Sequence, residues 1–314
     1  MTITETRNQG SSSGTLAQQQ IGWRATWATL SVLFKSRIVL LLLMAAVGGA
    51  FLGAGGWPGL GTLVLLLITG GLAASGSAGL NEYLEREPDA MMGRTRKRPL
   101  VTGKAQPQWV LWVSLGMILI PVVVVLPFNP ALSFFLFLGA FIYVAIYTIL
   151  LKPRTLLNIV IGGAAGSAAV MSGGAATGNW QEPAVIMLAL LVFLWTPSHF
   201  WSLAILYRND YEKAGIPMLP VKTSTKNSAY WVMLHTGSAS LVALLLALTP
   251  NLGIVYLIPV TIATIDLLVR NIRLIKNPTP QYARSLFISS NIYLTVVLLS
   301  VCIETVLHSF WSFL

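Results

Sequence analysis

Long apolar stretches recur along this sequence, and short polar connections separate them. A run of about 20 apolar residues can cross a bilayer core of about 30 Å, because an α-helix rises about 1.5 Å per residue. Such runs lie at 37–56, 59–81, 108–126, 130–151, 156–178, 182–207, 229–248, 252–270 and 286–307. The pattern predicts an all-α polytopic membrane protein with nine transmembrane helices.

Composition and charge support this prediction. The 314 residues are 55% hydrophobic and only 10% charged, whereas soluble domains are about 25% charged. All 20 Lys and Arg residues fall in the N-terminal segment and in alternate connections, and the connections near 55–58, 128–130, 178–183 and 250–253 contain none. Short cytoplasmic loops collect basic residues. We therefore expect a multi-pass protein of the cytoplasmic (inner) membrane, with its N-terminus inside and its C-terminus outside, and no nucleic-acid partner despite the net charge of +10.

The two ends of this pattern suggest a simple domain organisation. The first residues are rich in Ser, Gly and Gln, which predicts a disordered cytoplasmic tail over 1–22 and one transmembrane domain over 23–314. Cys302 is the single cysteine, so an intrachain disulfide and a CxxC motif are excluded. The longest inner loops, about 82–107 and 208–228, must carry most of the polar chemistry.

The first of these loops begins with a row of oxygen-bearing side chains. Asn81 and Glu85 are four residues apart, so a helix leaving the second span would place them on one face. Asp89 extends the row, but Pro88 disfavours helix there, and we expect Asp89 to hang from a turn. An amide oxygen and two carboxylates, with Glu87 nearby, form a donor set suited to Mg²⁺ held against a phosphate.

Basic residues follow this row directly. Arg94, Arg96, Lys97 and Arg98 could bind phosphate oxygens, because guanidinium groups match them with paired hydrogen bonds. The alternative is that Arg96 and Lys97 only anchor a cytoplasmic loop. That alternative does not explain the carboxylates at the membrane edge.

The second inner loop and its preceding span add further polar residues. Asp210 can supply a second carboxylate opposite the first loop, and Arg208, Tyr211 and Lys222 lie nearby. His199 lies about two turns inside the sixth span, where it could ligate iron or act as a base, or simply hydrogen-bond a neighbouring helix.

A third basic point lies between the fourth and fifth spans. Lys152 and Arg154 precede the run IGGAAGSAAVMSGGAATG, whose small residues favour close helix packing over a functional role.

Three stretches carry a resemblance to a known family. The row Asn81, Glu85 and Asp89 followed by MMGRTRKRPL resembles the first signature of UbiA-type intramembrane prenyltransferases, in their protohaem IX farnesyltransferase branch. The stretches YTILLKPRTLLN, from Tyr147, and AGIPMLPV, within the second loop, resemble the same branch, and the resemblance covers about 37–307. Two departures stand out: Glu87 is the middle acid where Asp is usual, and small or apolar residues replace an expected Pro-Pro pair around Ala169.

The resemblance implies a site and an activity. It implies nine helices around a central cavity that opens to the cytoplasmic side, with farnesyl diphosphate and haem B as substrates and Mg²⁺ as cofactor. The catalytic and metal-binding residues it implies are Asn81, Glu85, Asp89 and Asp210. The substrate-binding residues it implies are Arg94, Arg98, Lys152, Arg154, Arg208, Lys222, Tyr211 and His199, the last as the group that orients the porphyrin or ligates its iron.

The implied reaction is Mg²⁺-assisted ionisation of the diphosphate, attack by a haem vinyl group and formation of haem O. Besides its substrates and the lipid bilayer, the implied partners are a downstream haem-modifying enzyme or a terminal oxidase assembly. Two alternatives remain open. Another prenyltransferase of the same family, with an aromatic or tetrapyrrole acceptor, would keep the acidic loops. A transporter would place charges near the bilayer midplane, whereas most acidic residues here lie at the cytoplasmic ends.

Overall fold

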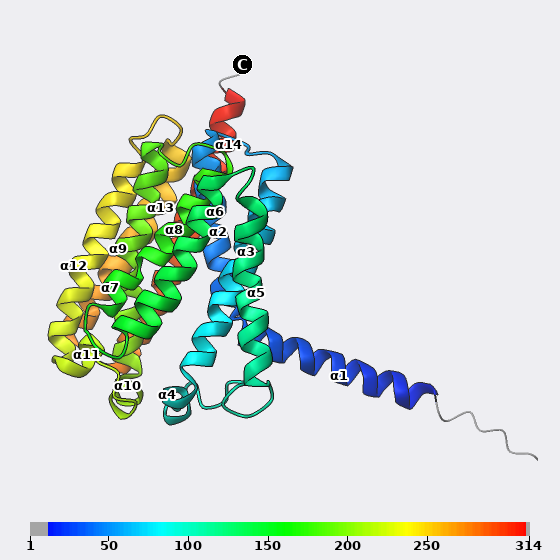
Figure 1. Cartoon of the computed structure of the whole chain (residues 1–314). Helices are drawn as coiled ribbons and strands as arrows, with labels where there is room; N and C mark the ends of the chain where they lie inside the picture. The colour runs from blue at the N-terminus through cyan, green and yellow to red at the C-terminus, as the bar shows by residue number, and fades with distance from the viewer. Residues whose placement is uncertain (1–11, 312–314) are drawn as a thin grey trace, which may run out of the picture.

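The computed structural model describes the backbone of residues 12–311 and the side chains of residues 22–309, and all of its regular elements are helices (Figure 1). In chain order they are α1 (Ser12–Leu33), α2 (Ser36–Ala54), α3 (Leu60–Leu84), α4 (Arg86–Met91), α5 (Pro107–Val125), α6 (Pro130–Phe141), the π-helix η1 (Ile142–Leu151), α7 (Asn158–Gly162), α8 (Ala164–Ala176), α9 (Pro183–Leu206), α10 (Arg208–Lys213), α11 (Leu219–Lys222), α12 (Thr225–Leu246), α13 (Ile254–Lys276) and α14 (Pro280–Trp311).

The predicted all-α fold with nine apolar spans is confirmed. Within residues 12–311, nine helical segments are long and apolar enough to cross a membrane, α6 continuing into η1 as one segment and α7 joining α8 as another. The largest differences from the predicted ends are six residues each: the eighth span ends at Lys276 rather than 270, and the last span begins at Pro280 rather than 286. Gln281 and Arg284 hid this start, because an apolar search ends at a charge although a long Arg side chain can reach back to the membrane surface.

The helix α1 precedes the bundle and extends away from it (Figure 1, blue). Residues 12–22 of the predicted disordered tail have a helical backbone as part of α1, whereas residues 1–11 lie outside the described residues. The exposed rings of Trp23 and Trp27 on α1 contact each other edge to face, with centroids 5.7 Å apart.

The packing of the bundle depends on small residues where two helices touch. The helices α2 and α8 lie side by side, and a Cβ added at Gly173 would overlap the backbone of Ala46. A Cβ at Gly49 would likewise overlap the backbone of Val170. The packing role predicted for the small residues of the fifth span is therefore confirmed. α8 is continuous through Ala169 and Val170, where the expected Pro-Pro pair is replaced.

The most deeply buried span is α9, which packs against α8, α12 and α14, whereas α5 and α13 lie at the periphery. Large apolar side chains such as Ile262 and Leu241 are exposed on the outer helices, as contact with lipid requires. The short helices α4, α10 and α11 all lie at one end of the bundle (Figure 1, bottom), and the described end of α14 lies at the other. The polar loops therefore meet at one end. The central cavity stays a prediction.

Candidate active site

The row of oxygen-bearing side chains predicted from the sequence is present on consecutive turns. Asn81 lies in the last turn of α3, Glu85 joins α3 to α4, and Asp89 lies within α4. The backbone hydrogen bonds Glu85 N to Asn81 O, 3.0 Å, and Asp89 N to Glu85 O, 2.9 Å, keep the spacing of one turn. All three residues are buried. We call Asn81, Glu85 and Asp89 the polar row.

The expectation that Asp89 hangs from a turn is wrong. The helix breaks at Glu85, and Asp89 is part of the following helix, α4. Proline clashes with the carbonyl group four residues earlier, which here belongs to Leu84, the last residue of α3. Pro88 itself lies in the first turn of α4, where no N–H is needed. The break therefore comes before the proline, and Asp89 keeps its place in the row.

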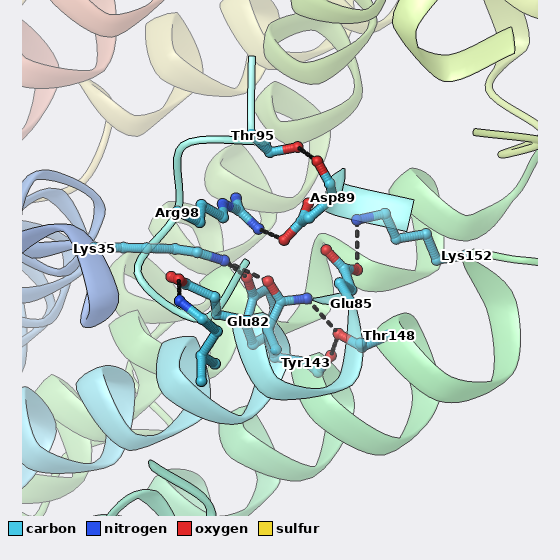
Figure 2. Close-up of polar contacts among 11 residues, drawn as sticks. Lys35, Glu82, Glu85, Asp89, Thr95, Arg98, Tyr143, Thr148 and Lys152 are labelled. Carbon is cyan, nitrogen blue, oxygen red and sulfur yellow. Dashed lines mark hydrogen bonds and ion pairs between the residues drawn. The ribbon is translucent and has the colours of Figure 1, made fainter. Parts of the chain in front are cut away.

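Each member of the polar row pairs with a cation from a different segment (Figure 2). The ammonium group of Lys35, between α1 and α2, donates to Asn81 Oδ1. Lys152, which follows η1, lies 2.5 Å from Glu85 Oε1. Arg98, in the loop after α4, forms an ion pair with Asp89. Segments far apart in the sequence, around Lys35, α3 and Lys152, thus meet at the polar row. We call Lys35, Lys152 and Arg98 the partner cations.

Lys35 reaches this position through an unusual backbone conformation. Its φ is 49°, and it is the only non-glycine residue among the described residues with a positive φ. This left-handed conformation separates α1 from α2 and costs about 1 kcal/mol for a residue with a Cβ. The side chain also donates to Tyr143 Oη at 3.2 Å. A lysine held this way at the polar row is a functional candidate, because such strain gathers at functional sites.

Two opposing effects set the pKa values at the polar row: burial disfavours the charged form of each group, and a neighbouring opposite charge favours it. Burial and the neighbouring guanidinium of Arg98 lower the pKa of Lys35 to about 7. Burial opposes ionisation of Glu85, but Lys152 and Lys35 outweigh it and lower the pKa of this carboxyl. Burial also opposes the charge on Lys152, and the Glu85 carboxylate outweighs it, so the pKa of Lys152 is raised. Glu85 and Lys152 therefore stabilise each other as a charged pair.

The π-helix η1 lines the other side of the polar row. Asn81 donates from Nδ2 to Thr148 Oγ1, 3.0 Å, and Thr148 donates to the Tyr143 carbonyl five residues earlier, 2.8 Å. The rings of Tyr143 and Tyr147 stack with centroids 5.7 Å apart, and Lys152 lies 5.6 Å from the Tyr147 ring. A π-helix inside a span is frequently found at functional sites, and here it directs aromatic and hydroxyl groups to the polar row.

The second inner loop touches the first directly. Asp210, at the start of α10, accepts a hydrogen bond from the backbone N–H of Arg94, 3.1 Å. The guanidinium of Arg94 lies 5.6 Å from the ring centre of Tyr207, which precedes α10. The two loops therefore meet at one end of the molecule, as the sequence predicts for Asp210.

The loop after α4 folds back over the polar row. Thr95 donates to the Asp89 carbonyl at 3.0 Å, and the backbone N–H of Leu100 lies 3.5 Å from Glu82 Oε1 (Figure 2). Glu82 is fully buried, and its Oε2 has no hydrogen-bond partner among the described residues. These contacts hold Arg98 at Asp89.

Within the described part of the chain, four other predicted site residues form no hydrogen bond or ion pair with the polar row. Arg154 donates to the carbonyls of Ile149 and Leu150, 2.7 and 2.8 Å, and so satisfies the end of η1. Arg208 is half-buried beside Asp210, and Lys222 is exposed at the end of α11. Tyr211 is buried in α10.

His199 is buried on α9, and one of the two alternatives left open for it is observed. Its Nδ1 lies 2.8 Å from Ser290 Oγ on α14, which is a hydrogen bond to a neighbouring helix. The imidazole also stacks on Trp195, with centroids 4.4 Å apart, and against Phe287, 4.6 Å. A role for His199 towards haem stays a prediction.

Sequence reasoning missed four residues at the polar row: Lys35, Glu82, Tyr143 and Thr148. Lys35 and Glu82 could have been identified from the sequence, since both are charged residues next to an apolar span. The charge pattern uses Lys35 only as evidence for the orientation in the membrane. Tyr143 and Thr148 could not be identified from the sequence, because they lie inside an apolar run whose π-helical geometry the sequence does not predict.

The chemistry of the polar row fits Mg²⁺ only in company with a further ligand. Among the described residues, no group of three or more His, Cys, Asp or Glu side chains lies close enough to hold a metal alone. Mg²⁺ usually binds one or two carboxylates together with substrate phosphates and water. The amide oxygen of Asn81 and the carboxylates of Glu85, Asp89 and Asp210 suit that mode, and the partner cations suit phosphate oxygens.

Sequence comparison places the chain among known proteins. The sequence profile described as "UbiA prenyltransferase family" matches residues 41–296. A protein of Metallosphaera sedula named "Protoheme IX farnesyltransferase" is 40% identical over 267 residues, which cover 85% of this chain and 92% of the relative. A protein of Sulfurisphaera tokodaii with the same name is 41% identical over 277 residues, covering 86% and 91%.

Two solved structures share the fold at low sequence identity. One, described as a digeranylgeranylglyceryl phosphate synthase, has a TM-score of 0.74 and 19% identity, covering 89% of this chain and 98% of that one. The other, described as a UbiA homologue from Archaeoglobus fulgidus bound to GPP and Mg²⁺, has a TM-score of 0.59 and 14% identity, covering 87% and 99%. Each likeness shows that this chain shares its fold with the solved structure.

Proposed function

This chain belongs to the UbiA prenyltransferase family, and from that premise we propose that it transfers a farnesyl group from farnesyl diphosphate to a vinyl group of protohaem IX, giving haem O. The polar row with its partner cations is the observation that carries the proposal. The substrates are those named by relatives that match this chain over 84% of its length or more.

The partner cations would hold the diphosphate. Lys152 and Arg98 now pair with Glu85 and Asp89, and both are mostly buried, with 15% of each side chain exposed. When the diphosphate binds, these cations can exchange a carboxylate for phosphate oxygens, so that every buried charge keeps a partner. A buried charge without a partner costs several kcal/mol. The exchange therefore favours a ligand that brings both a metal and an anion.

We propose Asn81, Glu85, Asp89 and Asp210 as the residues that hold Mg²⁺ with the diphosphate. A bound Mg²⁺ neutralises the negative charge that develops on a leaving diphosphate, most strongly where water is excluded. The three residues of the polar row are buried, and Thr95, in the loop after α4, donates a hydrogen bond to the Asp89 carbonyl. The backbone N–H of Arg94 holds the Asp210 carboxylate against the loop that follows α4. The Archaeoglobus fulgidus structure is described as bound to GPP and Mg²⁺, which supports this assignment.

The farnesyl chain is apolar, and we propose that it lies among the spans beside η1. The stacked rings of Tyr143 and Tyr147 lie next to the polar row, where their faces can stabilise an allylic cation by ~1–2 kcal/mol each. His199 on α9 is our candidate for orienting the porphyrin, with Trp195 stacked on its imidazole. Arg154, Arg208, Lys222 and Tyr211 stay candidate substrate-binding residues on sequence grounds.

We also propose that the end carrying α4, α10 and α11 faces the cytoplasm, in the inner membrane. All basic residues fall in the N-terminal segment and in alternate connections, which suits the cytoplasmic side of the membrane. Because the number of spans is odd, the C-terminus would then lie outside. A reporter fused after residue 314 that is active only in the exported compartment tests this orientation. A downstream haem-modifying enzyme or oxidase assembly as partner rests on the family resemblance alone.

The decisive experiment is a product assay with the purified protein. The full chain in detergent or nanodiscs is incubated with haem B, farnesyl diphosphate and Mg²⁺, and the haem is analysed by mass spectrometry. We expect a haem product that has gained a farnesyl group and a hydroxyl group, the hydroxyl coming from water, with diphosphate released. Parallel reactions with EDTA, and with the Asp89→Asn variant, should give unmodified haem.

The same assay separates the alternatives. Prenylation of an aromatic acid or a tetrapyrrole ester, with haem unchanged, would assign another acceptor within the family. Absence of any diphosphate release with every acceptor, together with uptake of an ion into vesicles, would favour a transporter. Either result would overturn the haem proposal, and only the second would overturn prenyl transfer.

A further inference from the structure

A groove lined by both polar and apolar side chains lies between α13 and α14, away from the polar row. It has a volume of about 340 Å³ and is lined by Arg270 of α13 and by Gln281, Arg284, Ser285, Ile288, Ser289 and Ile292 of α14. These α14 residues recur every three or four positions, so they share one face of the helix. The groove lies at the end of α13 and the beginning of α14, which is the end where all polar loops gather.

A chain of hydrogen bonds fixes the floor of the groove. Arg270 Nε lies 2.9 and 2.8 Å from the two carboxylate oxygens of Asp266, and its Nη1 donates to Ser285 Oγ at 2.5 Å. Ser289 Oγ donates to Asp266 Oδ2 at 2.6 Å. Asp266 lies within a span although 48% of its side chain is exposed. A carboxylate there is costly, and such residues mark binding sites or ion pathways. Here the carboxylate orients Arg270.

Donors without protein partners remain at the mouth of the groove. Arg284 is exposed, and no acidic side chain among the described residues forms an ion pair with it. Nη2 of Arg270 likewise finds no acceptor in the described part of the chain. Arg273 and Lys276, in the last turn of α13, add positive charge nearby. One carboxylate among four basic groups leaves this end of the groove positive.

The groove changes character along α14. Gln281, Arg284 and Ser285 come first, in the opening turns of the helix, and Ile288 and Ile292 follow. At 1.5 Å per residue, Ile292 lies about 16 Å beyond Gln281, which is well into the hydrocarbon region. Ile288 and Ile292 are 46% and 58% exposed. The surface therefore offers hydrogen-bond donors at the membrane edge and apolar contacts below them.

We propose that this groove binds an anionic phospholipid, with its phosphate on Arg284, Arg270 and Gln281 and an acyl chain against Ile288 and Ile292. Basic pockets between transmembrane helices on the cytoplasmic side suit such head groups, and guanidinium groups match phosphate oxygens. Both ends of an amphiphile find a matching surface. A soluble phosphate would use the donors but leave the exposed isoleucines without a partner.

The test measures lipid binding directly and does not depend on prenyl transfer. Purified full-length protein in a neutral detergent is titrated with phosphatidylglycerol or phosphatidylcholine and followed by native mass spectrometry. We expect one phosphatidylglycerol to bind more tightly than phosphatidylcholine, and Arg284→Gln to weaken that binding about fivefold. Arg284→Gln removes an exposed side chain without an ion-pair partner, so folding should be retained, and thermal unfolding checks this.

A matched control uses Arg273→Gln, which also removes one positive charge at this end of the molecule, from the last turn of α13, but at a residue that does not line the groove. It should change phosphatidylglycerol binding less than twofold. Equal weakening by the two variants would show unspecific charge attraction and overturn the proposal. Glycerol phosphate, the head group without chains, should bind far more weakly than the lipid. Equal affinity would overturn the assignment to a lipid.

Discussion

Buried carboxylates occur at both ends of this molecule, and their partners differ. At the inner end, Glu85 and Asp89 are 7% and 3% exposed and pair with the cationic side chains of Lys152 and Arg98. Towards the other end, Glu304 is 9% exposed, and its Oε2 accepts from the backbone N–H of Tyr256 in the first turn of α13, 2.6 Å.

This difference separates a binding site from a structural contact. The N–H of a helix start is fixed by the helix and needs an acceptor, so Glu304 caps α13. A lysine or arginine side chain can rotate to another anion. Burial of a carboxylate is therefore a poor guide to function by itself. A better guide is whether its partner is a side chain that can rotate or a backbone group that is fixed.

The strongest way to break the comparison is to neutralise one acid of the polar row. Asp89→Asn keeps the size of the side chain but loses the charge that pairs with Arg98 and, as we propose, binds Mg²⁺. We expect kcat for haem farnesylation to fall about 10³-fold with membrane insertion unchanged. Initial rates by mass spectrometry measure this, and full activity would remove the polar row from the reaction.

Removing a partner cation should have the next largest effect. Lys152→Met leaves Glu85 buried without its ion-pair partner, and we expect a loss of about 3 kcal/mol of stability. The double variant Lys152→Met, Glu85→Gln should recover most of this stability and remain inactive. Thermal unfolding and the product assay distinguish these outcomes. Recovery of activity in the double variant would make the pair purely structural.

A smaller effect is expected from a substitution of His199, which is buried on α9. His199→Ala should weaken haem binding about tenfold, or ~1.4 kcal/mol, with farnesyl diphosphate binding unchanged. Ser290→Ala is the matched control, because it removes the partner of Nδ1 and keeps the imidazole. Haem titration by absorbance measures both variants. Equal losses in the two variants, or an equal loss for both substrates, would leave His199 as a helix contact.

The smallest effect on activity is expected at Glu304. Glu304→Gln keeps an acceptor for the Tyr256 N–H but removes the charge at the start of α13, which should cost about 1 kcal/mol of stability. The rate of farnesyl transfer should change less than twofold. A large loss of kcat with an unchanged unfolding temperature would contradict the distinction drawn from its backbone partner.

Much of the fold could be read from the sequence, because membrane spans announce themselves by length and polarity. The polar row was also readable, since Asn81, Glu85 and Asp89 follow helical spacing at the end of a span. The pairing could not be read, because Lys152 and Arg154 look alike in sequence and differ only in direction. Lys152 pairs with Glu85, and Arg154 donates to carbonyls at the end of η1.

The position of the helix break and the contribution of η1 also escaped prediction. The proline pattern identified a break but placed it beside Pro88, whereas the clash acts on the carbonyl a full turn earlier. A π-helix shifts side chains from the expected α-helical faces, so Thr148 could not be placed at Asn81 by counting residues.

The left-handed backbone at Lys35 has a consequence for anyone who evolves this protein in the laboratory. Glycine is the residue that relaxes such a conformation at no steric cost. A library screened only for heat resistance should therefore enrich glycine at position 35, and a library screened for product should reject it. Selection for heat tolerance therefore favours glycine at position 35, and selection for turnover favours lysine.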